Sequence, residues 1–516
     1  MTDGERPTLG DLAQVLGTPL PGASTAHPST TVTGVTLDSR RVQPGDLYAA
    51  LPGANVHGAR FSAQAAASGA VAVLTDPAGQ PDAAATGLPV LVVDDPRAVL
   101  GDLAARVHGH PGRALRTVGV TGTNGKTTTA YLVESLLRAA GWTTGLLGTI
   151  ETRVAGERIS SVRTTPEAPD LHALLARMVA AGVRGCALEV SSHALALHRV
   201  DGLVVDVAAF TNLSQDHLDF HGSMQGYFEA KAALFTPAHA RRGIVWVDPA
   251  DPDRWGERLA ARATVPVATV GPEGDWRVRD VRTGRAHSTF RLTGGGPGRE
   301  VDLQLRCPLP GEFNVANAAL AVVAALELGL DPGLLPGALA AAEGVPGRMQ
   351  PVEREGAPLV VVDYAHTPDA LDRVLRTLRA GTPGRLVAVF GAGGDRDRGK
   401  RPLMGAAVAA AADVAVVTDD NPRSEDPAAV RAAVLSGARS VTGAPAEVVE
   451  VPDRRAAVAA ALARCTGPQD TVLLAGKGHE RGQETAGTVA PFDDREVAAR
   501  ELEEWLAVHA ARGGTQ

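Results

Sequence analysis

The sequence predicts an α/β protein of about three domains, and three observations lead to that prediction. The chain has 516 residues, whereas a single domain usually holds roughly 100–200. Short apolar runs alternate with helical patterns along most of the chain, as in βαβ units that form a parallel sheet. A glycine-rich turn ending in Gly125-Lys126-Thr127 stands between one such run and a helical pattern, which is typical of a nucleotide-binding domain.

The composition excludes several classes of protein. The formal net charge of −8 argues against a dedicated nucleic-acid binder, which is usually basic. The three cysteines lie far apart and form no CxxC pair, which fits a reducing compartment and gives no thiolate metal site. No apolar run approaches the roughly 18 residues that span a bilayer, and no signal segment precedes the first domain. We therefore expect a cytoplasmic monomer that inserts into no membrane and binds no nucleic acid.

The first domain is predicted at residues 1–112 as a small α/β unit, with a boundary at Pro111-Gly112. Two strands joined by a polar turn are expected within 34–51, followed by strands at 70–74 and 89–93.

The second domain is predicted at residues 113–345 and holds the glycine-rich turn. Its expected strands are 117–120, 186–190, 204–210 and 243–247, and its expected helices are 127–140, 171–181 and 314–328. The stretch 271–306 is expected to form an antiparallel extension of the sheet.

The third domain is predicted at residues 346–516 as a Rossmann-like sheet. Five strands are expected at 359–362, 386–390, 414–418, 446–451 and 471–475. The turn at 391–396 has Arg396 where a dinucleotide fingerprint needs its third glycine, so NAD binding is rejected.

The glycine-rich turn is interpreted as a variant P-loop. Its backbone N–H groups and the positive end of the next helix favour phosphate oxygens, Lys126 reaches the outer phosphates, and the Thr127 hydroxyl holds Mg²⁺. Val120 occupies the place of the first glycine in the strict pattern. A chance Lys-Thr after a glycine turn is the alternative, and the strand-before, helix-after context favours nucleotide binding.

Polar groups also follow the next two strands. Glu189 ends one strand and is followed by Ser191, and Asp216-His217 comes after the other. Ligands gather at the carboxyl ends of parallel strands, and Mg²⁺ prefers oxygen donors. A lone Asp-His pair is usually a helix cap, but three successive strand ends with polar groups favour a site.

In the third domain, Arg348 could stabilise phosphoryl charge or form an interdomain ion pair. The segments 419–423 and 476–480 carry both signs of charge, which suits a zwitterion such as an amino acid, whereas the charged stretch 395–401 is typical of a solvated face. The residues alone therefore indicate an enzyme that uses ATP and Mg²⁺ and has a zwitterion pocket. They do not name the bond that it makes.

The motifs of the chain resemble those of the Mur ligase family over nearly its whole length. They are TLDSR (36–40), TGTNGKTT (121–128), RTTPEA (163–168), EVSSHAL (189–195), TNLSQDHLDFHG (211–222), YFEAKAALF (227–235), GEFNVANAA (311–319), PGRM (346–349), DYAHTPDAL (363–371), FGAGGDRDRGKRPLM (390–404), DDNPRSEDP (419–427) and AGKGHE (475–480). The resemblance implies uridine binding by the first domain, ATP binding by the second and amino-acid binding by the third. It is strongest to the branch that adds a diamino acid to UDP-N-acetylmuramoyl-L-Ala-D-Glu.

The resemblance also implies roles for individual residues. ATP would phosphorylate the D-Glu γ-carboxylate, and the amine of the diamino acid would attack the acyl phosphate. The implied nucleotide site comprises Gly122, Thr123, Asn124, Gly125, Lys126, Thr127, Thr128, Asn317, Arg348, Asp363 and His366. The implied Mg²⁺ set is Thr127, Glu189, His217 and Lys231, the last carbamylated, and the implied catalytic set is Lys126, Glu189, His217, Lys231 and Arg348.

Two further sets would bind the substrates. Ser39, Thr164, Thr165, Ser191 and Arg199 match contacts to the UDP-muramoyl dipeptide, and Arg396, Asn421, Pro422, Arg423, Gly476 and Glu480 match the pocket for the added amino acid. The Asn-Pro-Arg form implies meso-diaminopimelate, with L-lysine and L-ornithine as alternatives. Two places depart from the family pattern: the Asp-Gly-His element of the first domain reads Val56-His-Gly-Ala-Arg60, and Leu197 replaces a glutamine.

Three other functions fit the sequence less well. A folylpolyglutamate synthetase would lack the Asp-Ser-Arg and Asp-Asn-Pro-Arg motifs present here. A non-catalytic regulator would be expected to lose Lys126, Glu189, His217 or Arg348. A switch GTPase would carry an Asn-Lys-x-Asp motif, which does not occur in the chain.

Overall fold

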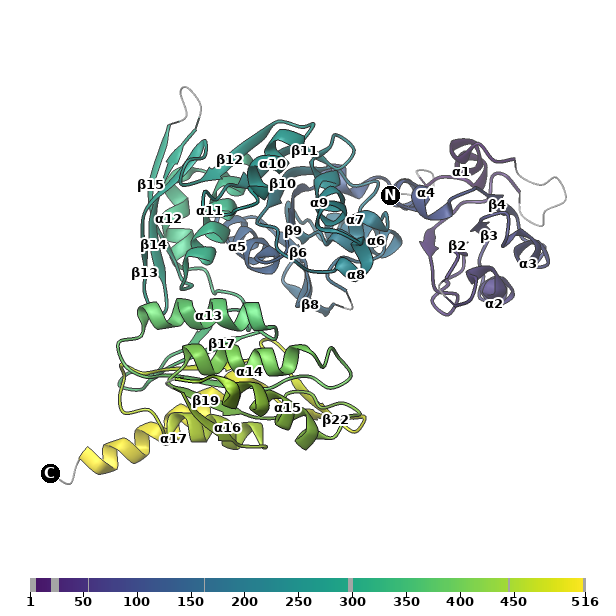
Figure 1. Cartoon of the computed structure of the whole chain (residues 1–516). Coiled ribbons are helices and arrows are strands. Elements are labelled where there is room, and N and C mark those ends of the chain that lie inside the picture. The colour runs from purple at the N-terminus through teal and green to yellow at the C-terminus, as the bar shows by residue number, and fades with distance from the viewer. Residues whose placement is uncertain are drawn as a thin grey trace. The chain divides into compact units, whose positions relative to one another are not determined.

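The computed structural model of the chain confirms the α/β fold class (Figure 1). The structure describes residues 6–19, 27–53, 55–161, 163–295, 300–443 and 446–513. The chain forms two compact units. The first comprises Met1–Val278, Leu292–Asp302 and Ala316–Ala338, and the second comprises Arg279–Arg291, Leu303–Val315 and Leu339–Gln516. The predicted boundaries at 112 and 345 stay predictions.

The N-terminal part of the first unit is a four-stranded parallel sheet in the order β1-β2-β3-β4. Its strands are β1 (Gly34–Thr36), β2 (Asp46–Ala49), β3 (Ala72–Thr75) and β4 (Val90–Val92), which confirms the predicted strands. Its helices are α1 (Leu9–Leu16), α2 (Ser62–Ala67), α3 (Gln80–Ala84) and α4 (Pro96–Val107). Thr8 and Asp11 form a capping box that fixes the start of α1.

The second sheet has eleven strands in the order β15-β14-β13-β12-β11-β10-β5-β9-β6-β7-β8. Their bounds are β5 (Arg116–Thr121), β6 (Thr144–Leu147), β7 (Glu151–Val154), β8 (Glu157–Ser160), β9 (Gly185–Glu189), β10 (Val205–Phe210), β11 (Ala240–Trp246), β12 (Val267–Gly271), β13 (Trp276–Thr283), β14 (Ser288–Gly294) and β15 (Val301–Cys307). The strands from β12 to β6 pair in parallel, which places their carboxyl ends at one edge.

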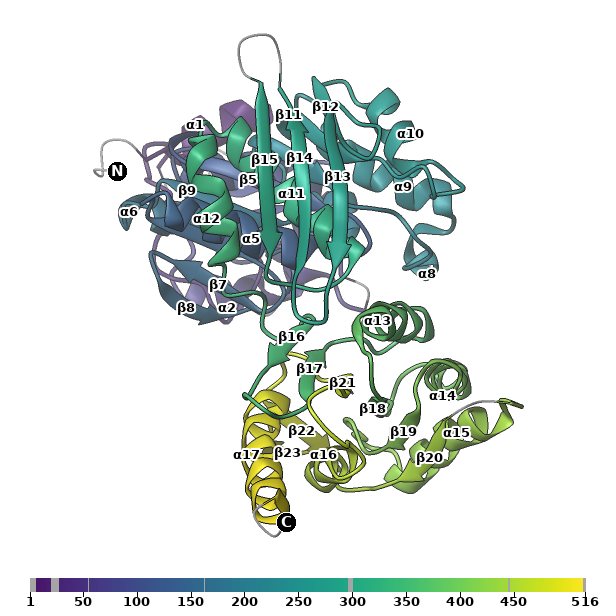
Figure 2. The ribbon, with the colours of Figure 1, turned by 90° about the vertical axis from the view of Figure 1, so that its left-hand side faces the viewer.

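The stretch 271–306 was expected to be an antiparallel extension, and it does hold β13, β14 and β15 (Figure 2). These three strands are neighbours at one end of the sheet, and β13 joins β12 in parallel. Antiparallel pairing among β13, β14 and β15 stays a prediction. At the other end of the sheet, β7 pairs antiparallel with β6 and with β8.

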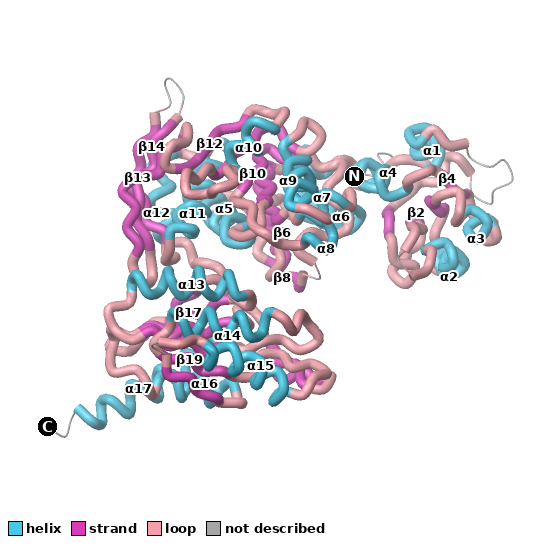
Figure 3. Tube along the Cα trace, viewed as in Figure 1, coloured by secondary structure: helices cyan, strands magenta, loops and turns pink. Residues whose placement is uncertain are grey.

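Helices alternate with these strands (Figure 3). They are α5 (Lys126–Ala139), α6 (Ala168–Ala180), α7 (Ser192–Ala196), α8 (Leu218–His221), α9 (Met224–Ala232), α10 (Trp255–Arg262), α11 (Glu312–Glu327) and α12 (Leu335–Ala340). The predicted helices at 127–140, 171–181 and 314–328 correspond to α5, α6 and α11. Their buried faces are largely alanine, valine and leucine, as the low aromatic content requires.

The third sheet lies in the second unit in the order β16-β17-β21-β18-β19-β20. It comprises β16 (Gln350–Val352), β17 (Leu359–Asp363), β18 (Leu386–Phe390), β19 (Val414–Val417), β20 (Glu447–Glu450) and β21 (Thr471–Ala475), so all five predicted strands are confirmed. The strands are parallel except for β16. A hairpin of β22 (Gly482–Thr485) and β23 (Thr488–Pro491) follows β21.

Alternate residues of the third sheet face two separate cores. Val361 and Leu473 pack with α13 (Pro368–Gly381), α14 (Lys400–Ala411) and α15 (Pro427–Ser440). Val360 and Val472 face α16 (Arg454–Leu462) and α17 (Asp494–Gly513) on the other side. Each fully buried valine or leucine contributes about 1.5–3 kcal/mol to folding, and continuous apolar runs are what a sheet covered on both faces needs.

Candidate active site

The glycine-rich turn between β5 and α5 can form only with glycine at two positions. Gly122 and Gly125 have φ angles of 147° and 86°, which other residues rarely adopt. A Cβ atom at residue 122 would collide with the Thr211 hydroxyl, and one at residue 125 would collide with the amide of Asn317. The loop therefore wraps closely around these two polar side chains. Its backbone conformation is that of a phosphate-binding turn at a helix N-terminus.

Side chains from the neighbouring strand end hold the loop in place. Asn212 Oδ1 accepts from the Asn124 N–H at 3.0 Å, and Thr211 Oγ1 donates to the Asn124 carbonyl at 2.6 Å. Thr123 Oγ1 contacts the Tyr227 hydroxyl at 3.2 Å. Three segments far apart in the sequence thus meet at the P-loop: the end of β10, α9 through Tyr227 and α11 through Asn317.

Two lysines share one acceptor in this loop. Lys126 Nζ donates to the carbonyl oxygen of Gly122 at 3.0 Å, and Lys231 Nζ donates to the same oxygen at 2.8 Å. Lys231 is only 1% exposed. Burial and then the charge of Lys126 lower the pKa of Lys231 well below its usual range. A lysine in such surroundings favours its uncharged, nucleophilic form.

The carboxylate of Glu189, at the end of β9, forms a second group with hydroxyls. Glu189 Oε2 accepts from Thr127 Oγ1 at 2.8 Å and from Thr149 Oγ1 at 3.1 Å, and Oε1 accepts from the Thr149 N–H at 2.7 Å. Glu189 is 1% exposed, and a buried carboxylate must be hydrogen-bonded or bound to a cation. The structure thus brings the predicted residues Thr127 and Glu189 together, and it adds Thr149, which was not predicted.

The residues expected to contact the UDP-linked substrate in this domain continue the same network. Thr165 Oγ1 donates to the backbone carbonyl of Glu189 at 2.9 Å and accepts from the Ser191 N–H at 3.1 Å. The Thr164 hydroxyl lies 3.0 Å from the hydroxyl of Thr149. These residues therefore lie directly beside the predicted metal-binding carboxylate.

His217 lies in an aromatic cluster next to Lys231. Its ring centroid is 4.7 Å from that of His193 and 6.2 Å from that of Tyr227. Lys231 Nζ lies 4.4 Å from the centre of the Tyr227 ring. Tyr227 thus contacts two members of the predicted metal set. Within the part of the chain that the structure describes, no three His, Cys, Asp or Glu side chains are grouped as metal ligands.

Ser39 and His57, which is part of the first departure from the family pattern, lie in loops of the N-terminal sheet. Ser39 Oγ donates to Gln64 Oε1 at 3.0 Å. His57 Nδ1 accepts from the Ala59 N–H at 3.0 Å, and its Nε2 lies 3.0 Å from Asp76 Oδ1. The histidine thereby caps the 3₁₀ helix Gly58–Phe61, a position in which aspartate is also a good acceptor.

The carboxylate of Glu167 forms ion pairs with three arginines, one of which is Arg199. Arg199 Nε lies 3.0 Å from Glu167 Oε1, Arg97 Nη1 lies 3.2 Å from Oε2, and Arg163 also pairs with this carboxylate. Leu197, the second departure, offers its backbone carbonyl to Arg97 at 3.3 Å. Glu167 therefore orients the predicted substrate-binding arginine.

In the second unit, the residues expected at the nucleotide gather around Tyr364. The guanidinium of Arg348 lies 4.6 Å from the centre of its ring, and the ring of His366 lies 4.7 Å away. Asp363 accepts from the N–H groups of Met349 and Ala365 at 2.7 and 2.8 Å. Burial raises the pKa of Asp363, while the charge of Arg348 opposes that rise.

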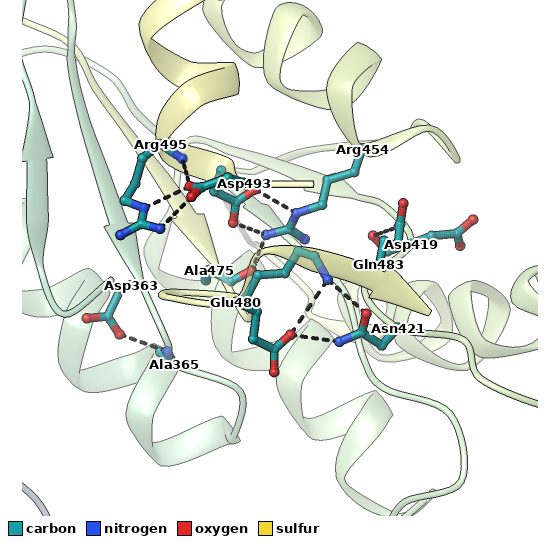
Figure 4. A network of polar contacts seen from close by, with 12 residues as sticks. Asp363, Ala365, Asp419, Asn421, Arg454, Ala475, Glu480, Gln483, Asp493 and Arg495 are labelled. Carbon is teal, nitrogen blue, oxygen red and sulfur yellow. Dashed lines mark hydrogen bonds and ion pairs between the residues drawn. The ribbon is translucent and has the colours of Figure 1, made fainter. Parts of the chain in front are cut away.

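The loop after β21 lies against the loop after β19 and forms a polar group (Figure 4). Asn421 Nδ2 donates to Glu480 Oε2 at 2.8 Å, and Lys477 Nζ donates to Asn421 Oδ1, also at 2.8 Å. Gly476 has a φ of 112°, and a Cβ atom there would collide with the Asp420 carboxylate. The close approach of these two loops therefore requires glycine at residue 476.

The remaining residues of the predicted amino-acid pocket border this group. Arg423 has a φ of 53° and donates from Nη1 to the Gly394 carbonyl at 2.6 Å. A Cβ atom at Gly393 would lie 3.1 Å from Arg423 Nη1 and 3.8 Å from Arg396 Cγ, so both arginines border this glycine. The carbonyl of Pro422 leaves no room for a side chain at residue 394. The structure therefore brings Arg396, Pro422 and Arg423 together.

The residues of these groups that were not assigned from the sequence include Thr149, Tyr227, Tyr364 and Lys477. Thr149 follows an unpredicted strand, and nothing in the local pattern marks it. Tyr227, Tyr364 and Lys477 lie inside quoted motifs. One signal was available for Lys477, because the chain has only four lysines against 46 arginines.

The chain matches three family models, described as the Mur ligase family catalytic domain over residues 31–108, the Mur ligase middle domain over 120–325 and the Mur ligase glutamate ligase domain over 347–478. These matches cover the N-terminal sheet, the P-loop region and the third sheet.

Two curated relatives and one solved structure show the same similarity along the chain. UDP-N-acetylmuramoyl-L-alanyl-D-glutamate–2,6-diaminopimelate ligase of Streptomyces coelicolor is 56% identical over 495 residues, which is 95% of each chain. UDP-N-acetylmuramyl-tripeptide synthetase of Leifsonia xyli is 48% identical over 92% of this chain and 93% of its own. A solved structure of a UDP-N-acetylmuramoyl-L-alanyl-D-glutamate–2,6-diaminopimelate ligase is 33% identical, with a TM-score of 0.68, and covers 93% of this chain and 96% of its own.

Proposed function

The chain belongs to the Mur ligase family, and from this premise we propose that it joins meso-2,6-diaminopimelate to UDP-N-acetylmuramoyl-L-Ala-D-Glu with consumption of ATP. The new bond is an amide between an amino group of the diamino acid and the γ-carboxyl group of D-Glu. The observation that carries this proposal is the similarity to a ligase of that specificity along 95% of the chain. ATP and the UDP-linked precursor are cytoplasmic metabolites, so we place the reaction in the cytoplasm.

The reaction has two steps. An oxygen of the γ-carboxylate attacks the γ-phosphorus of ATP, ADP leaves, and an acyl phosphate forms. The uncharged amine then attacks the acyl carbon, the tetrahedral intermediate expels phosphate, and the nitrogen loses its extra proton. Phosphoryl transfer depends on positioning and on stabilising charge rather than on covalent chemistry by the protein.

The P-loop of the first unit would bind the ATP phosphates. The N–H groups of residues 122–128 and the N-terminus of α5 favour anions, and Lys126 adds a cation at the same turn. Asn317 lies against the same loop. In the second unit, Arg348, Asp363 and His366 are proposed to contact the nucleotide, and the cluster around Tyr364 supports their grouping.

The oxygen atoms of Thr127 and Glu189 fit Mg²⁺, which prefers hard oxygen donors. Lys231 would join the set as a carbamate, and His217 lies near it across Tyr227. Bound Mg²⁺ would neutralise charge on the phosphates of ATP. The residues of this chain would hold it and exclude water around Glu189, which is almost fully buried.

The proposed substrate contacts form two sets, one for each substrate. Ser39, Thr164, Thr165, Ser191 and Arg199 are proposed for the UDP-muramoyl dipeptide. Arg396, Asn421, Pro422, Arg423, Gly476 and Glu480 are proposed for diaminopimelate, whose carboxylates suit the arginines and whose ammonium groups suit Glu480.

A substrate panel tests the proposed function. Phosphate release by the purified protein is measured with ATP, Mg²⁺, the UDP-muramoyl dipeptide and, in turn, meso-diaminopimelate, L-lysine and L-ornithine. We expect release only with all components present and the highest kcat/KM with meso-diaminopimelate. A higher kcat/KM with L-lysine or L-ornithine would change the assigned amino acid, and no amino-acid-dependent release would overturn the ligase.

A further inference from the structure

Lys477 lies outside every set assigned so far, although it is a fully buried cation next to the amino-acid pocket. It is 0% exposed and stands between Gly476 and Gly478, whose φ angles are 112° and 54°. Its Nζ donates to Asn421 Oδ1 at 2.8 Å and lies 3.7 Å from Glu480 Oε2. Asn421 and Glu480 both belong to the predicted pocket, so Lys477 contacts two residues of that pocket.

The hydrogen bonds of Lys477 decide which way the Asn421 amide points. Asn421 Oδ1 accepts from Lys477 Nζ at 2.8 Å and from the Glu484 N–H at 3.0 Å. Both donors approach the oxygen, so the oxygen faces the interior. The Nδ2 group therefore faces Glu480 and donates to its Oε2 at 2.8 Å.

Lys477 lies among the carboxylates of the pocket. Lys477 and Arg454 both face Asp420, Glu480 and Asp494. Arg454 donates to the Ala475 carbonyl at 2.9 Å (Figure 4). Arg454 also pairs with Asp494 at 2.7 Å, with both charged groups fully buried. Lys477 forms the ion pair with Glu480, while Arg423 also acts on Glu480 and Lys400 on Asp420. Loss of the Lys477 ammonium would therefore remove the ion-pair partner of Glu480.

Lysine is rare in this chain, because arginine supplies 46 of the 50 basic residues. The Lys477 ammonium lies between Asn421 and Glu480. A planar guanidinium cannot replace this compact Nζ without moving one of the two partners. An ammonium group therefore fits this position better than a guanidinium.

We infer that Lys477 is a positioning residue that sets the orientation of the Asn421 amide and the charge of Glu480, and thereby the affinity for the zwitterionic head of the added amino acid. This inference rests on the proposed function, because it assigns a residue to the pocket of that reaction. Lys477 itself does not touch the substrate. It acts through the hydrogen-bond donor Asn421 and the acceptor Glu480, which are both proposed to contact the substrate.

The test uses Lys477→Met, which removes the ammonium and keeps the length of the chain, and Lys477→Gln, which keeps a polar donor without charge. KM and kcat are measured for each of the three substrates. We expect KM for the diamino acid to rise by about 10- to 100-fold in Lys477→Met, because hydrogen bonds to charged groups are lost, while KM for ATP stays within about twofold of the wild type. The Gln variant should show a smaller rise.

A double-mutant cycle separates positioning from a merely structural role. In a Glu480→Gln background, Lys477→Met should raise KM for the diamino acid by much less than in the wild type, because the anion that Lys477 supports is already gone. Equal effects in both backgrounds, or proportional increases in KM for all three substrates, would overturn the inference. Failure of the wild type to release phosphate with any amino acid would instead overturn the proposed function, so the two failures are distinct.

Discussion

Lys126 and Lys231 donate to one carbonyl oxygen, that of Gly122, at 3.0 and 2.8 Å. Two ammonium groups on one acceptor repel each other, and Lys231 is also cut off from water. Its pKa is lowered for both reasons, with burial the larger cause. The conversion of Lys231 to an anionic carbamate would turn this repulsion into attraction and place oxygen atoms beside the P-loop.

We therefore predict that Lys231 is carbamylated in the active enzyme. The uncharged amine that burial favours attacks CO₂, and the carbamate formed loses a proton. With ¹³C-bicarbonate, the wild type should show a carbamate NMR signal that Lys231→Ala lacks. Lys231→Ala should lose activity and regain part of it with formate or acetate. Full activity of Lys231→Ala without additives would contradict this role.

Lys126→Ala should abolish ATP turnover and leave the fold intact. The loop retains its N–H groups, but a preorganised cation at the phosphates is lost, which costs on the order of 10²–10³ in rate at comparable sites. Steady-state phosphate release measures the rate, and circular dichroism checks the fold. Near-normal turnover by the folded variant would contradict the assignment of this turn as a P-loop.

Arg423→Ala should raise KM for diaminopimelate far more than KM for ATP. Arg423 lies beside Gly393 and Gly394 in the amino-acid pocket and can pair with the distal carboxylate, which L-lysine and L-ornithine lack. Arg398→Ala is the matched control, because Arg398 is a largely exposed arginine of the neighbouring loop that pairs with Glu425. Similar KM changes in the two variants would show that Arg423 has no special role.

Asp494→Ala should lower stability by about 3–5 kcal/mol, because it leaves Arg454 charged, buried and unpaired. The exposed pair of Arg500 and Glu496 is the comparison, and Glu496→Ala should cost no more than about 1 kcal/mol. Urea unfolding followed by circular dichroism measures both. Equal midpoints for the two variants would mean that the buried pair adds little to stability.

The apolar strands of the third sheet could be predicted because they are buried on both faces, so Leu386–Phe390 and Thr471–Ala475 are nearly uninterrupted apolar runs. The strand Glu157–Ser160 could not, since it is a short, polar and largely exposed edge. Tertiary pairing alone holds it in place.

None of the helices in the described ranges is long and apolar enough to cross a bilayer. The monomeric state stays a prediction.

Some residues of the site could likewise be predicted from the sequence, and others could not. Lys126, Thr127 and Glu189 could be placed because they end strands or begin helices, where parallel topology brings side chains together. Thr149 could not, because its role arises only from the distance of its N–H to Glu189, which is 2.7 Å. Contacts of that kind depend on chain geometry after folding and leave no periodic signal.

Transfer of oxygen from the substrate carboxylate to phosphate tests the central claim most directly. UDP-N-acetylmuramoyl-L-Ala-D-Glu labelled with ¹⁸O in the γ-carboxylate is turned over with ATP and meso-diaminopimelate, and the released phosphate is analysed by mass spectrometry. An acyl phosphate intermediate predicts one ¹⁸O atom in each phosphate and one amide bond for each phosphate released. Unlabelled phosphate, or phosphate released without amide product, would contradict ligation through this intermediate.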